Sequence, residues 1–245
     1  MKGFLLLLQF MTRIPTPKME YNPKEMGKAM KFFPVIGMII GGILYSSYLF
    51  INQYFDSPTL VVLIVLLIEV VLTGGLHLDG LADTFDGIFS YRSKKRMLEI
   101  MKDSRIGSNG VLALILYFLF KITLLAEVIS IDQMPYFLLV MPVISRFASV
   151  LNCGIAKYAR DTGMGKYLVE ETTFVGVVIS FLITAGYSYY FVGIAGIYSL
   201  LLVVILAGYF AKLMERKIGG ITGDTLGAVL EMSGIVVLFV GAING

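Results

Sequence analysis

Three acidic side chains follow directly after an apolar run that ends near residue 74. Asp79, Asp83 and Asp86 occupy positions i, i+4 and i+7, a spacing that puts three carboxylates on one face of a helix. Like charges stacked in this way repel one another unless a cation lies between them. Oxygen ligands without sulfur partners suit Mg²⁺ or Mn²⁺. Because most of the intervening residues are apolar, the pattern favours a divalent-metal site over a solvated acidic face.

His77 is the only histidine and lies two residues before Asp79. An imidazole titrates near neutral pH, so His77 is a candidate general base. Two residues correspond to about 200° of helical rotation, so a continuous helix would point His77 away from Asp79. A break at Gly74–Gly75 would be needed to bring it round. A capping or supporting role for His77 is an equal alternative.

A second polar stretch precedes the apolar run that starts at Gly110. It contains Lys102, Ser104 and Arg105, followed by Gly107. Backbone N–H groups at the start of a helix attract anions, and arginine binds phosphate through two parallel hydrogen bonds. The stretch therefore predicts a phosphate contact, with a plain glycine-rich loop as the alternative.

A third polar stretch runs from Lys217 to Glu231. Asp224 and Glu231 are seven residues apart and share one face of an otherwise apolar helix. Ionisable groups in such positions usually have a function. Thr222 and Thr225 flank Asp224.

Isolated charges also occur inside the apolar runs, at Glu69, Lys121, Glu127 and Arg146. We expect structural partners for these side chains. Arg146 lies near the end of its run, where a long side chain can reach the membrane surface. Arg160 is expected to extend a basic rim outside the membrane.

The composition indicates the class of fold that carries these residues. Of the 245 residues 57% are hydrophobic and 15% are charged, whereas ordinary soluble domains have about 25% charged residues. A soluble fold of this size could not bury that much apolar surface. We therefore predict an all-α, polytopic membrane helical bundle of about seven transmembrane helices, forming a single integral membrane domain over residues 1–245. The predicted spans are Phe32–Phe50, Pro58–Gly74, Gly110–Ile129, Tyr136–Leu151, Phe174–Phe191, Ile194–Ala211 and Leu226–Ala242.

The loops between these runs alternate in charge. Most of the 20 Lys and Arg residues fall in four loops, and the three intervening loops, Ile51–Ser57, Ser130–Pro135 and Val192–Gly193, contain none. Because cytoplasmic loops collect basic residues, the polar motifs are predicted to lie on the cytoplasmic side of the cell inner membrane.

Two segments outside the spans are predicted to contact the membrane surface. Met1–Met11 lacks a cleavage site of small residues and is expected to be a retained interfacial or re-entrant segment. Tyr91–Asp103 is expected to form a cytoplasmic amphipathic helix that touches membrane lipid. The net charge of +3 is too small and dispersed to indicate nucleic acid, and one cysteine, Cys153, rules out an internal disulfide.

Metal-binding carboxylates that face basic and glycine-rich loops suit phosphoryl-group transfer. Residue types alone thus predict a membrane enzyme that joins a nucleotide-activated phosphate to an alcohol.

Three motifs carry a family resemblance. Gly75–Gly87, Met97–Gly107 and Gly219–Ala228 closely resemble the cobalamin synthase family, the adenosylcobinamide-GDP ribazoletransferases, and Gln9–Pro17 resembles the family's start. The resemblance implies a Mg²⁺-dependent enzyme of a bacterial or archaeal cytoplasmic membrane. In the implied reaction, α-ribazole or its 5′-phosphate displaces GMP from adenosylcobinamide-GDP.

The resemblance also implies roles for individual residues. Asp79, Asp83 and Asp86 become metal ligands, Asp103 and Asp224 a second set, and His77 the base for the ribazole hydroxyl. The implied substrate contacts are Arg13, Lys102, Asp103, Ser104, Arg105, Arg146, Thr222 and Thr225. A homo-oligomer is compatible with the sequence.

Two other functions share parts of this sequence pattern. A phospholipid-type CDP-alcohol phosphotransferase would share the aspartates, but its motif places Arg where Asp83 follows Ala82. A secondary transporter would carry its carboxylates at the membrane midplane, whereas the densest acidic motif lies at the end of a run.

Overall fold

The computed structural model describes residues 2–130 and 134–244, and within these residues it is helical with no β-strand. Residues 131–133, in the predicted loop Ser130–Pro135, lie outside the described part. The elements are α1 (Lys2–Met11), α2 (Pro23–Lys28), η1 (Ala29–Phe32), α3 (Phe33–Ile51), α4 (Pro58–Thr73), α5 (Leu76–Ile88), α6 (Lys94–Ile100), α7 (Ser108–Ser130), η2 (Met134–Tyr136), α8 (Phe137–Ile155), α9 (Met164–Glu170), α10 (Phe174–Ile218) and α11 (Gly223–Ile243).

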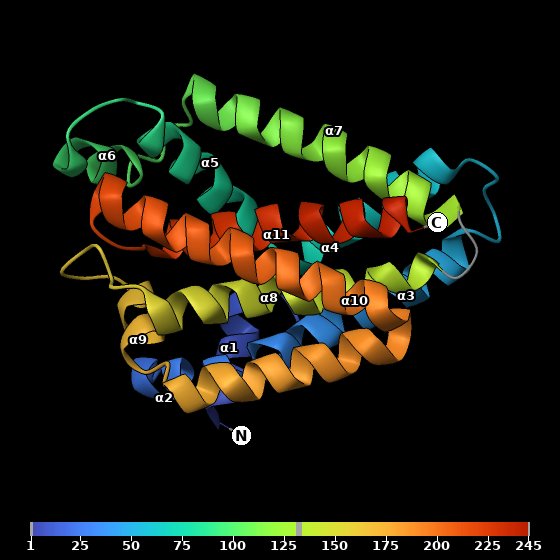
Figure 1. Cartoon of the computed structure of the whole chain (residues 1–245), viewed down its shortest axis with the longest axis horizontal. Helices are drawn as coiled ribbons and strands as arrows, with labels where there is room; N and C mark the ends of the chain where they lie inside the picture. Colours follow the sequence, from blue (N-terminus) through green and yellow to red (C-terminus); the bar gives the residue numbers. More distant parts are fainter. Residues whose placement is uncertain (1, 131–133, 245) are drawn as a thin grey trace.

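The long helices form the bundle of a multi-pass membrane protein (Figure 1), which confirms the predicted all-α class. By length and composition, five helices of the described chain are able to cross a membrane, or six if the bent pair α4–α5 counts as one span. The predicted number was about seven. The count differs partly because α10, with 45 residues, contains two of the predicted runs.

The helix α10 is broken between these two runs. Val192 and Gly193 have non-helical backbone angles, and Gly193 has a positive φ of 57°. After the break the chain turns back, so that Gly196 packs against the backbone of Ser188. Figure 1 shows the two arms of α10 running beside each other. Two apolar helices are thus joined with almost no polar loop.

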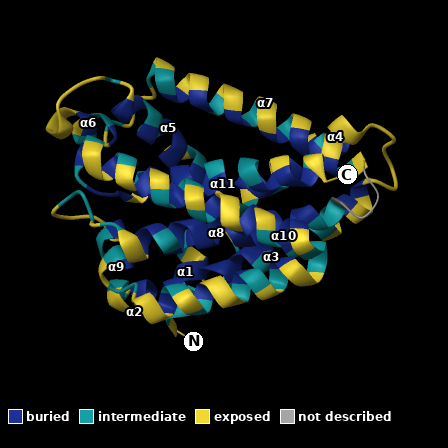
Figure 2. Ribbon diagram, viewed as in Figure 1, coloured by how far each residue is buried: buried dark blue, intermediate teal, exposed yellow. Residues whose placement is uncertain are grey.

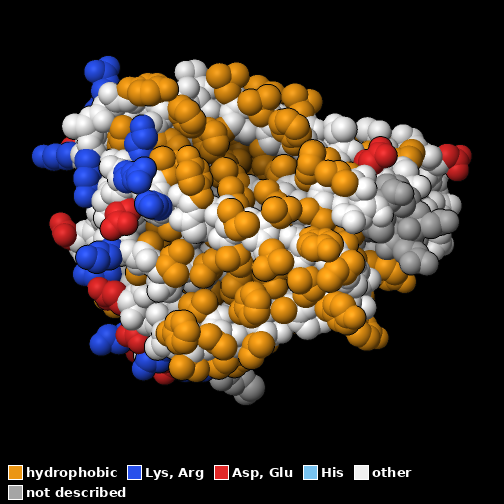
Figure 3. Space-filling model, viewed as in Figure 1, with side chains coloured by type: hydrophobic (Ala, Val, Ile, Leu, Met, Phe, Trp, Pro, Cys, Tyr) orange, Lys and Arg blue, Asp and Glu red, His pale blue; other side chains and the backbone are white. Residues whose placement is uncertain are grey.

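The surface is divided between apolar flanks and a basic end. Apolar side chains cover the middle of the molecule, and the Lys and Arg side chains gather at one end (Figure 3). The outer faces of α7 and α10 are exposed, while α8 lies in the centre with nearly all its side chains buried (Figure 2). A large exposed apolar flank of this kind is unusual in soluble proteins and suits a helical bundle surrounded by lipid.

A sharp elbow separates α4 from α5. Gly74 and Gly75 both have positive φ, 64° and 70°, and the two helix axes differ by 88°. Other residue types rarely adopt such angles, which explains the paired glycines. The elbow ends the predicted second span and sets α5, with its aspartates, in a new direction.

Two short helices correspond to the segments that were predicted to contact the membrane surface. The predicted interfacial or re-entrant segment forms α1, whose Leu6, Leu7 and Leu8 are buried against other helices. Ten residues make a helix of about 15 Å, which is too short to span a membrane. The predicted amphipathic helix is confirmed but shorter than expected, since α6 covers Lys94–Ile100, with Met97 buried and its lysines exposed.

Candidate active site

The acidic motif is held against the last helix by close packing of glycines. A Cβ atom on Gly80 of α5 would lie 2.7 Å from the carbonyl oxygen of Asp224, and one on Gly227 of α11 would lie 3.1 Å from the Cα of His77. Only glycine allows backbones to approach this closely. The contact brings Asp79 and Asp83 of α5 next to Asp224 of α11.

These carboxylates are poorly neutralised by their surroundings. Asp79 is exposed and Asp83 half-buried, and neither side chain has a hydrogen bond or ion pair with the described residues. Asp83 experiences the charges of Asp79, Asp224 and Asp86, against which Arg160 is the opposing charge. Repulsion among them would be relieved by a bound cation.

Asp86 has a different environment from the other two aspartates of α5. Its carboxylate is buried and accepts hydrogen bonds from the backbone N–H groups of Gly107, at 2.7 Å, and Gly110, at 2.8 Å. The positive end of α7 is thus occupied by a carboxylate of the protein itself. The two amides that the sequence suggested for a phosphate donate to Asp86 instead.

The loop between α6 and α7 keeps its charged residues at the surface. Lys102, Ser104 and Arg105 are exposed. Arg105 binds Asp103 through two hydrogen bonds, of 3.0 Å to Oδ1 and 2.7 Å to Oδ2. These hydrogen bonds lower the pKa of Asp103 to about 2. None of these residues lines the cavities beside Asp79.

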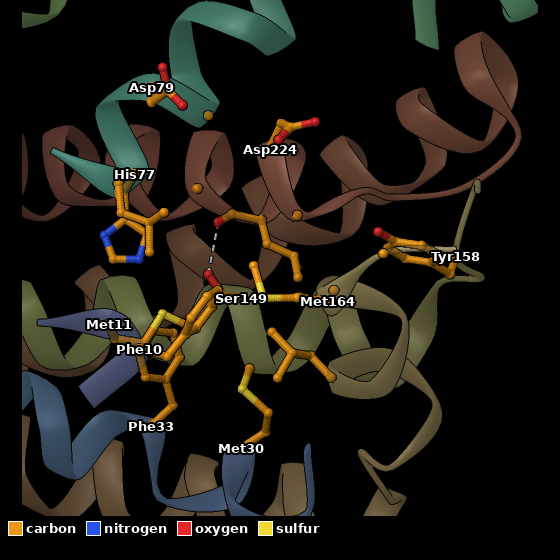
Figure 4. A pocket seen from close by; sticks show the side chains of 18 of the residues that line it. Phe10, Met11, Met30, Phe33, His77, Asp79, Ser149, Tyr158, Met164 and Asp224 are labelled. Carbon is orange, nitrogen blue, oxygen red and sulfur yellow. Dashed lines mark hydrogen bonds between the residues drawn. The ribbon is translucent and has the colours of Figure 1, made fainter. Parts of the chain in front are cut away.

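A cavity of about 240 Å³ lies beside the carboxylates (Figure 4). Asp79 and Asp224 are on one side of it, and Phe10, Met30 and Phe33 are on the other. The remaining wall comes from α8, α9 and the loop before α9. The residues that line it are Phe10, Met11, Met30, Phe33, Leu76, His77, Asp79, Gly80, Ser149, Tyr158, Arg160, Gly163, Met164, Gly165, Leu168, Gly223, Asp224, Leu226 and Gly227.

His77 lines the apolar side of this cavity. It is buried, with 5% of its surface exposed, and its ring centroid is 6.4 Å from that of Phe33. The backbone break at Gly74–Gly75 exists, but it precedes both His77 and Asp79 on the continuous helix α5. The break therefore does not bring His77 round towards Asp79, although both residues line one cavity.

Arg13 reaches the site from the N-terminal segment. Its backbone N–H donates to the carbonyl of Leu72 at 2.7 Å, and its guanidinium contacts Gly74. A second cavity of about 310 Å³ is lined by both Arg13 and Asp79. The structure thus places the predicted Arg13 within reach of the same space as the acidic motif.

Arg160 and Tyr158 are contributed by a loop that the sequence did not assign to the site. The N–H of Ala159 donates to the carbonyl of Ile221 and the N–H of Ile221 to that of Lys157, both at 2.8 Å. This short bridge aligns Arg160 so that its Nη2 lies 2.8 Å from Oδ2 of Asp224. Burial raises the pKa of the Tyr158 hydroxyl.

Three predicted substrate contacts have structural partners. Thr222 and Thr225 are buried and cap α11 reciprocally, with each backbone N–H donating to the other side chain. Arg146 is 2% exposed, and its Nη1 donates to the carbonyl of Pro142 at 3.1 Å. The prediction that Arg146 reaches the membrane surface is therefore wrong. None of the three lines either cavity.

A divalent cation at this site would take its protein ligands from the nearby side chains. Within residues 2–130 and 134–244, no three His, Cys, Asp or Glu side chains converge as a ready-made metal site. Mg²⁺, however, commonly uses one or two protein carboxylates and takes its other ligands from water and substrate phosphates. The unpaired oxygens of Asp79 and Asp83 fit that kind of site.

The chain resembles one protein family over nearly its whole length. The family model described as cobalamin-5-phosphate synthase matches residues 3–242. Among curated proteins, the adenosylcobinamide-GDP ribazoletransferase of Fusobacterium nucleatum is 49% identical, over 98% of this chain and 96% of its own length. Proteins of the same name from Caldanaerobacter subterraneus and Thermoanaerobacter pseudethanolicus are 42% and 38% identical, covering 94% and 97% of this chain and 94% and 95% of their own lengths. No solved structure matches the chain. The chain therefore belongs to the cobalamin-5-phosphate synthase family.

Proposed function

We propose that this protein is a membrane-embedded transferase that joins adenosylcobinamide-GDP to α-ribazole, or to its 5′-phosphate, and releases GMP. The relatives that cover nearly the whole chain carry the name of this activity. The observation that supports it most directly is the group of carboxylates Asp79, Asp83 and Asp224, of which Asp79 and Asp224 line a cavity together with Arg160.

In the proposed reaction, a ribose hydroxyl oxygen attacks the phosphorus on the cobinamide side of the diphosphate. A new P–O bond forms, the P–O bond to GMP breaks, and the hydroxyl proton passes to a base. A bound Mg²⁺ would neutralise the diphosphate and stabilise the charge that develops on GMP. We assign Asp79 and Asp83 as the residues that hold the ion, together with Asp224 once Arg160 has moved to the substrate.

The two arginines that flank the carboxylates are suited to the diphosphate. Arg160 has a buried Nε atom with no hydrogen-bond partner in the described structure, and only its Nη2 is used by Asp224. Arg13 lies across the second cavity from Asp79. Guanidinium groups bind phosphate oxygens through parallel hydrogen bonds, so these residues would hold the donor with its leaving group away from the apolar cavity wall.

Two groups on the cavity wall are able to accept the hydroxyl proton, Asp79 and His77. The substitution His77→Asn distinguishes them, because it removes the imidazole and keeps a polar side chain. A fall in kcat of about a hundredfold or more would identify His77 as the base. A change confined to KM would leave this role to Asp79.

The experiment that tests the proposed function offers two donors to the purified protein in liposomes with Mg²⁺. We expect GMP release from adenosylcobinamide-GDP that depends on α-ribazole, and no CMP release from a CDP-activated lipid alcohol. CMP release alone would replace this proposal by the phospholipid-type reaction. Uptake of substrate into sealed vesicles without GMP formation would favour a transporter.

We further propose that the basic end faces the cytoplasm, in the inner membrane of a bacterial cell or its archaeal equivalent. The support is the clustering of Lys and Arg at the end that carries the site (Figure 3). A single cysteine at Ser104 should react with a membrane-impermeant maleimide only after the cells are opened. A single cysteine at Ser57, an exposed residue of a loop free of Lys and Arg, should react in intact cells. The reverse pattern would invert the orientation.

A further inference from the structure

The cavity beside the carboxylates has two chemically different sides. Its floor is apolar and is formed by Phe10, Met11, Met30 and Phe33, while Asp79 and Asp224 lie on the opposite side (Figure 4). Leu168 and Arg160 also line the cavity. Met30 and Phe33 are each only 1% exposed. Pockets with an apolar floor and few polar groups usually bind a flat apolar ring system that carries a polar substituent.

The floor contains one unsatisfied polar group. His77 is 95% buried, and its ring makes no hydrogen bond with residues 2–130 and 134–244. Because Nδ1 is enclosed by protein, Nε2 is the ring nitrogen left open to the cavity. A buried polar atom without a partner costs free energy, so a ligand atom is expected to supply one. Ser149, another polar side chain that lines the cavity, already donates to the carbonyl of Leu226 at 2.9 Å (Figure 4).

The size and polarity of the floor distinguish among the chemical groups of the proposed substrates. A corrinoid is far larger than a cavity of about 240 Å³. Guanine presents several donors and acceptors along its edges, and an apolar floor would leave most of them unpaired. A benzimidazole joined to ribose has one remaining ring nitrogen, which is an acceptor. One acceptor on an otherwise apolar ring matches one unpartnered imidazole nitrogen on an otherwise apolar floor.

We propose that this cavity binds the acceptor nucleoside, with its benzimidazole ring against Phe10, Met30 and Phe33 and its free ring nitrogen accepting a hydrogen bond from Nε2–H of His77. The ribose then points towards Asp79 and Arg160, where its hydroxyl meets the donor phosphate. The thioethers of Met11 and Met30 adapt to ring substituents. This inference rests on the proposed function and identifies which substrate enters the cavity and what selects its base.

The proposal makes His77 a positioning residue for the acceptor. Asparagine keeps a side-chain N–H donor, whereas leucine has no polar atom. We therefore expect His77→Leu to weaken nucleoside binding about tenfold and His77→Asn to restore most of the affinity. The affinity for adenosylcobinamide-GDP should be unchanged in both variants.

The experiment measures equilibrium binding of α-ribazole to the purified protein in detergent, with chelator present and no corrinoid, through the fluorescence of its benzimidazole. The protein contains no tryptophan, so this signal has little background. The matched probe is the indole riboside of the same anomer, which has a C–H group in place of the free ring nitrogen. Wild type should prefer α-ribazole about tenfold over the indole riboside, and His77→Leu should bind the two equally.

A second pair of variants tests the apolar floor. Phe10→Leu should weaken binding of α-ribazole about threefold to tenfold through lost aromatic contact, whereas Phe50→Leu, an exposed position outside the cavity, should have no effect. A preference for α-ribazole that persists in His77→Leu, or equal binding of both ribosides to wild type, would overturn the proposal. GMP release with no ribazole preference would refute this inference alone. Ribazole binding without GMP release would refute the proposed function alone.

Discussion

Two clusters of charged residues occur in the described chain, and they differ in how completely they are neutralised. The first is the acidic site, formed by Asp79, Asp83 and Asp224. Two of its carboxylates have no protein partner in the described structure, and one faces Arg160. The second, here called the buried cluster, consists of Glu69, Lys121, Tyr117 and Glu231, on helices α4, α7 and α11.

The charged side chains of the buried cluster are hydrogen-bonded to one another or to Tyr117. Lys121 Nζ lies 2.9 Å from Glu69 Oε2 and 2.6 Å from the Tyr117 hydroxyl, and that hydroxyl donates to Glu231. All four side chains are less than 10% exposed. Their packing around a cavity of only about 10 Å³ leaves no room for a substrate.

The comparison shows that charge within an apolar bundle has two uses. Where the charges pair with one another, as in the buried cluster, they join helices and fix their register. Where they remain unpaired beside a cavity, as in the acidic site, they are available to a cation and a phosphate.

Removal of a carboxylate from the acidic site should abolish catalysis without unfolding the protein. We expect Asp83→Ala to lower kcat for GMP release by about 10³-fold or more, because charge stabilisation at the transferred phosphate would be lost. Its melting temperature in detergent should stay near that of wild type, since Asp83 has no partner in the described residues. Asp56→Ala, at an exposed position far along the sequence from the motif, is the control. Full activity of Asp83→Ala would mean that the aspartates are merely solvated.

Removal of a charge from the buried cluster should have the opposite effect. Glu69→Met leaves Lys121 without its main partner, and breaking a buried pair in this way costs about 3–5 kcal/mol of stability. We expect a lower melting temperature in detergent, with GMP release per folded molecule close to that of wild type.

The double variant Glu69→Met/Lys121→Met sharpens this test. Lys121 also lies 3.8 Å from Glu231, so each single variant leaves a buried charge with a weaker partner. If Glu69 and Lys121 stabilise each other, the loss of stability in the double variant should be smaller than the sum of the losses in Glu69→Met and Lys121→Met. Losses that simply add would contradict a structural role for the pair.

Arg160 links the acidic site to its substrate. We expect Arg160→Ala to lower kcat/KM for adenosylcobinamide-GDP by about a hundredfold, because a guanidinium contact to phosphate is lost. Arg160→Lys should recover only part of this, since an ammonium group cannot form two parallel hydrogen bonds. An unchanged KM for the donor with unchanged kcat would confine Arg160 to its ion pair with Asp224.

The loop between α6 and α7 should give the smallest effect. Arg105 is exposed and paired with Asp103 on the same loop, and such surface pairs contribute little. We expect Arg105→Ala to change GMP release less than about threefold. A loss of a hundredfold would show instead that this loop contacts the substrate, as the resemblance implies for Lys102, Ser104 and Arg105.

Local patterns predicted much of the architecture. The apolar runs, the basic loops and the i, i+4, i+7 spacing gave helices, a basic end and an acidic face on α5, because these features depend on residues close in the chain. The break in α10 was also visible as a gap between two runs at Val192–Gly193. The pairing of Glu69 with Lys121 confirms the structural partners expected for these two charges. For Glu127 the expectation is wrong, because its side chain is exposed and has no ion pair or hydrogen bond with the described residues.

Contacts between distant segments could not be predicted in the same way. Asp86 binds amides 21 and 24 residues away, so its helical spacing gave no sign that it serves the start of α7. Arg160 meets Asp224 across 64 residues. The apolar cavity floor comes from α1, η1 and α3, whose Phe and Met residues resemble membrane-facing side chains in the sequence. Only the packing of these helices shows that Phe10, Met30 and Phe33 line a cavity.

The most direct test of the proposed metal site is the metal dependence of GMP release. Purified protein in liposomes would be treated with chelator, supplied with adenosylcobinamide-GDP and α-ribazole, and titrated with Mg²⁺. Activity should fall to background after chelation and return with added Mg²⁺, and Asp79→Asn should need a higher Mg²⁺ concentration for half-maximal rate. Full GMP release in the presence of chelator would contradict the central claim that these carboxylates act through a divalent cation.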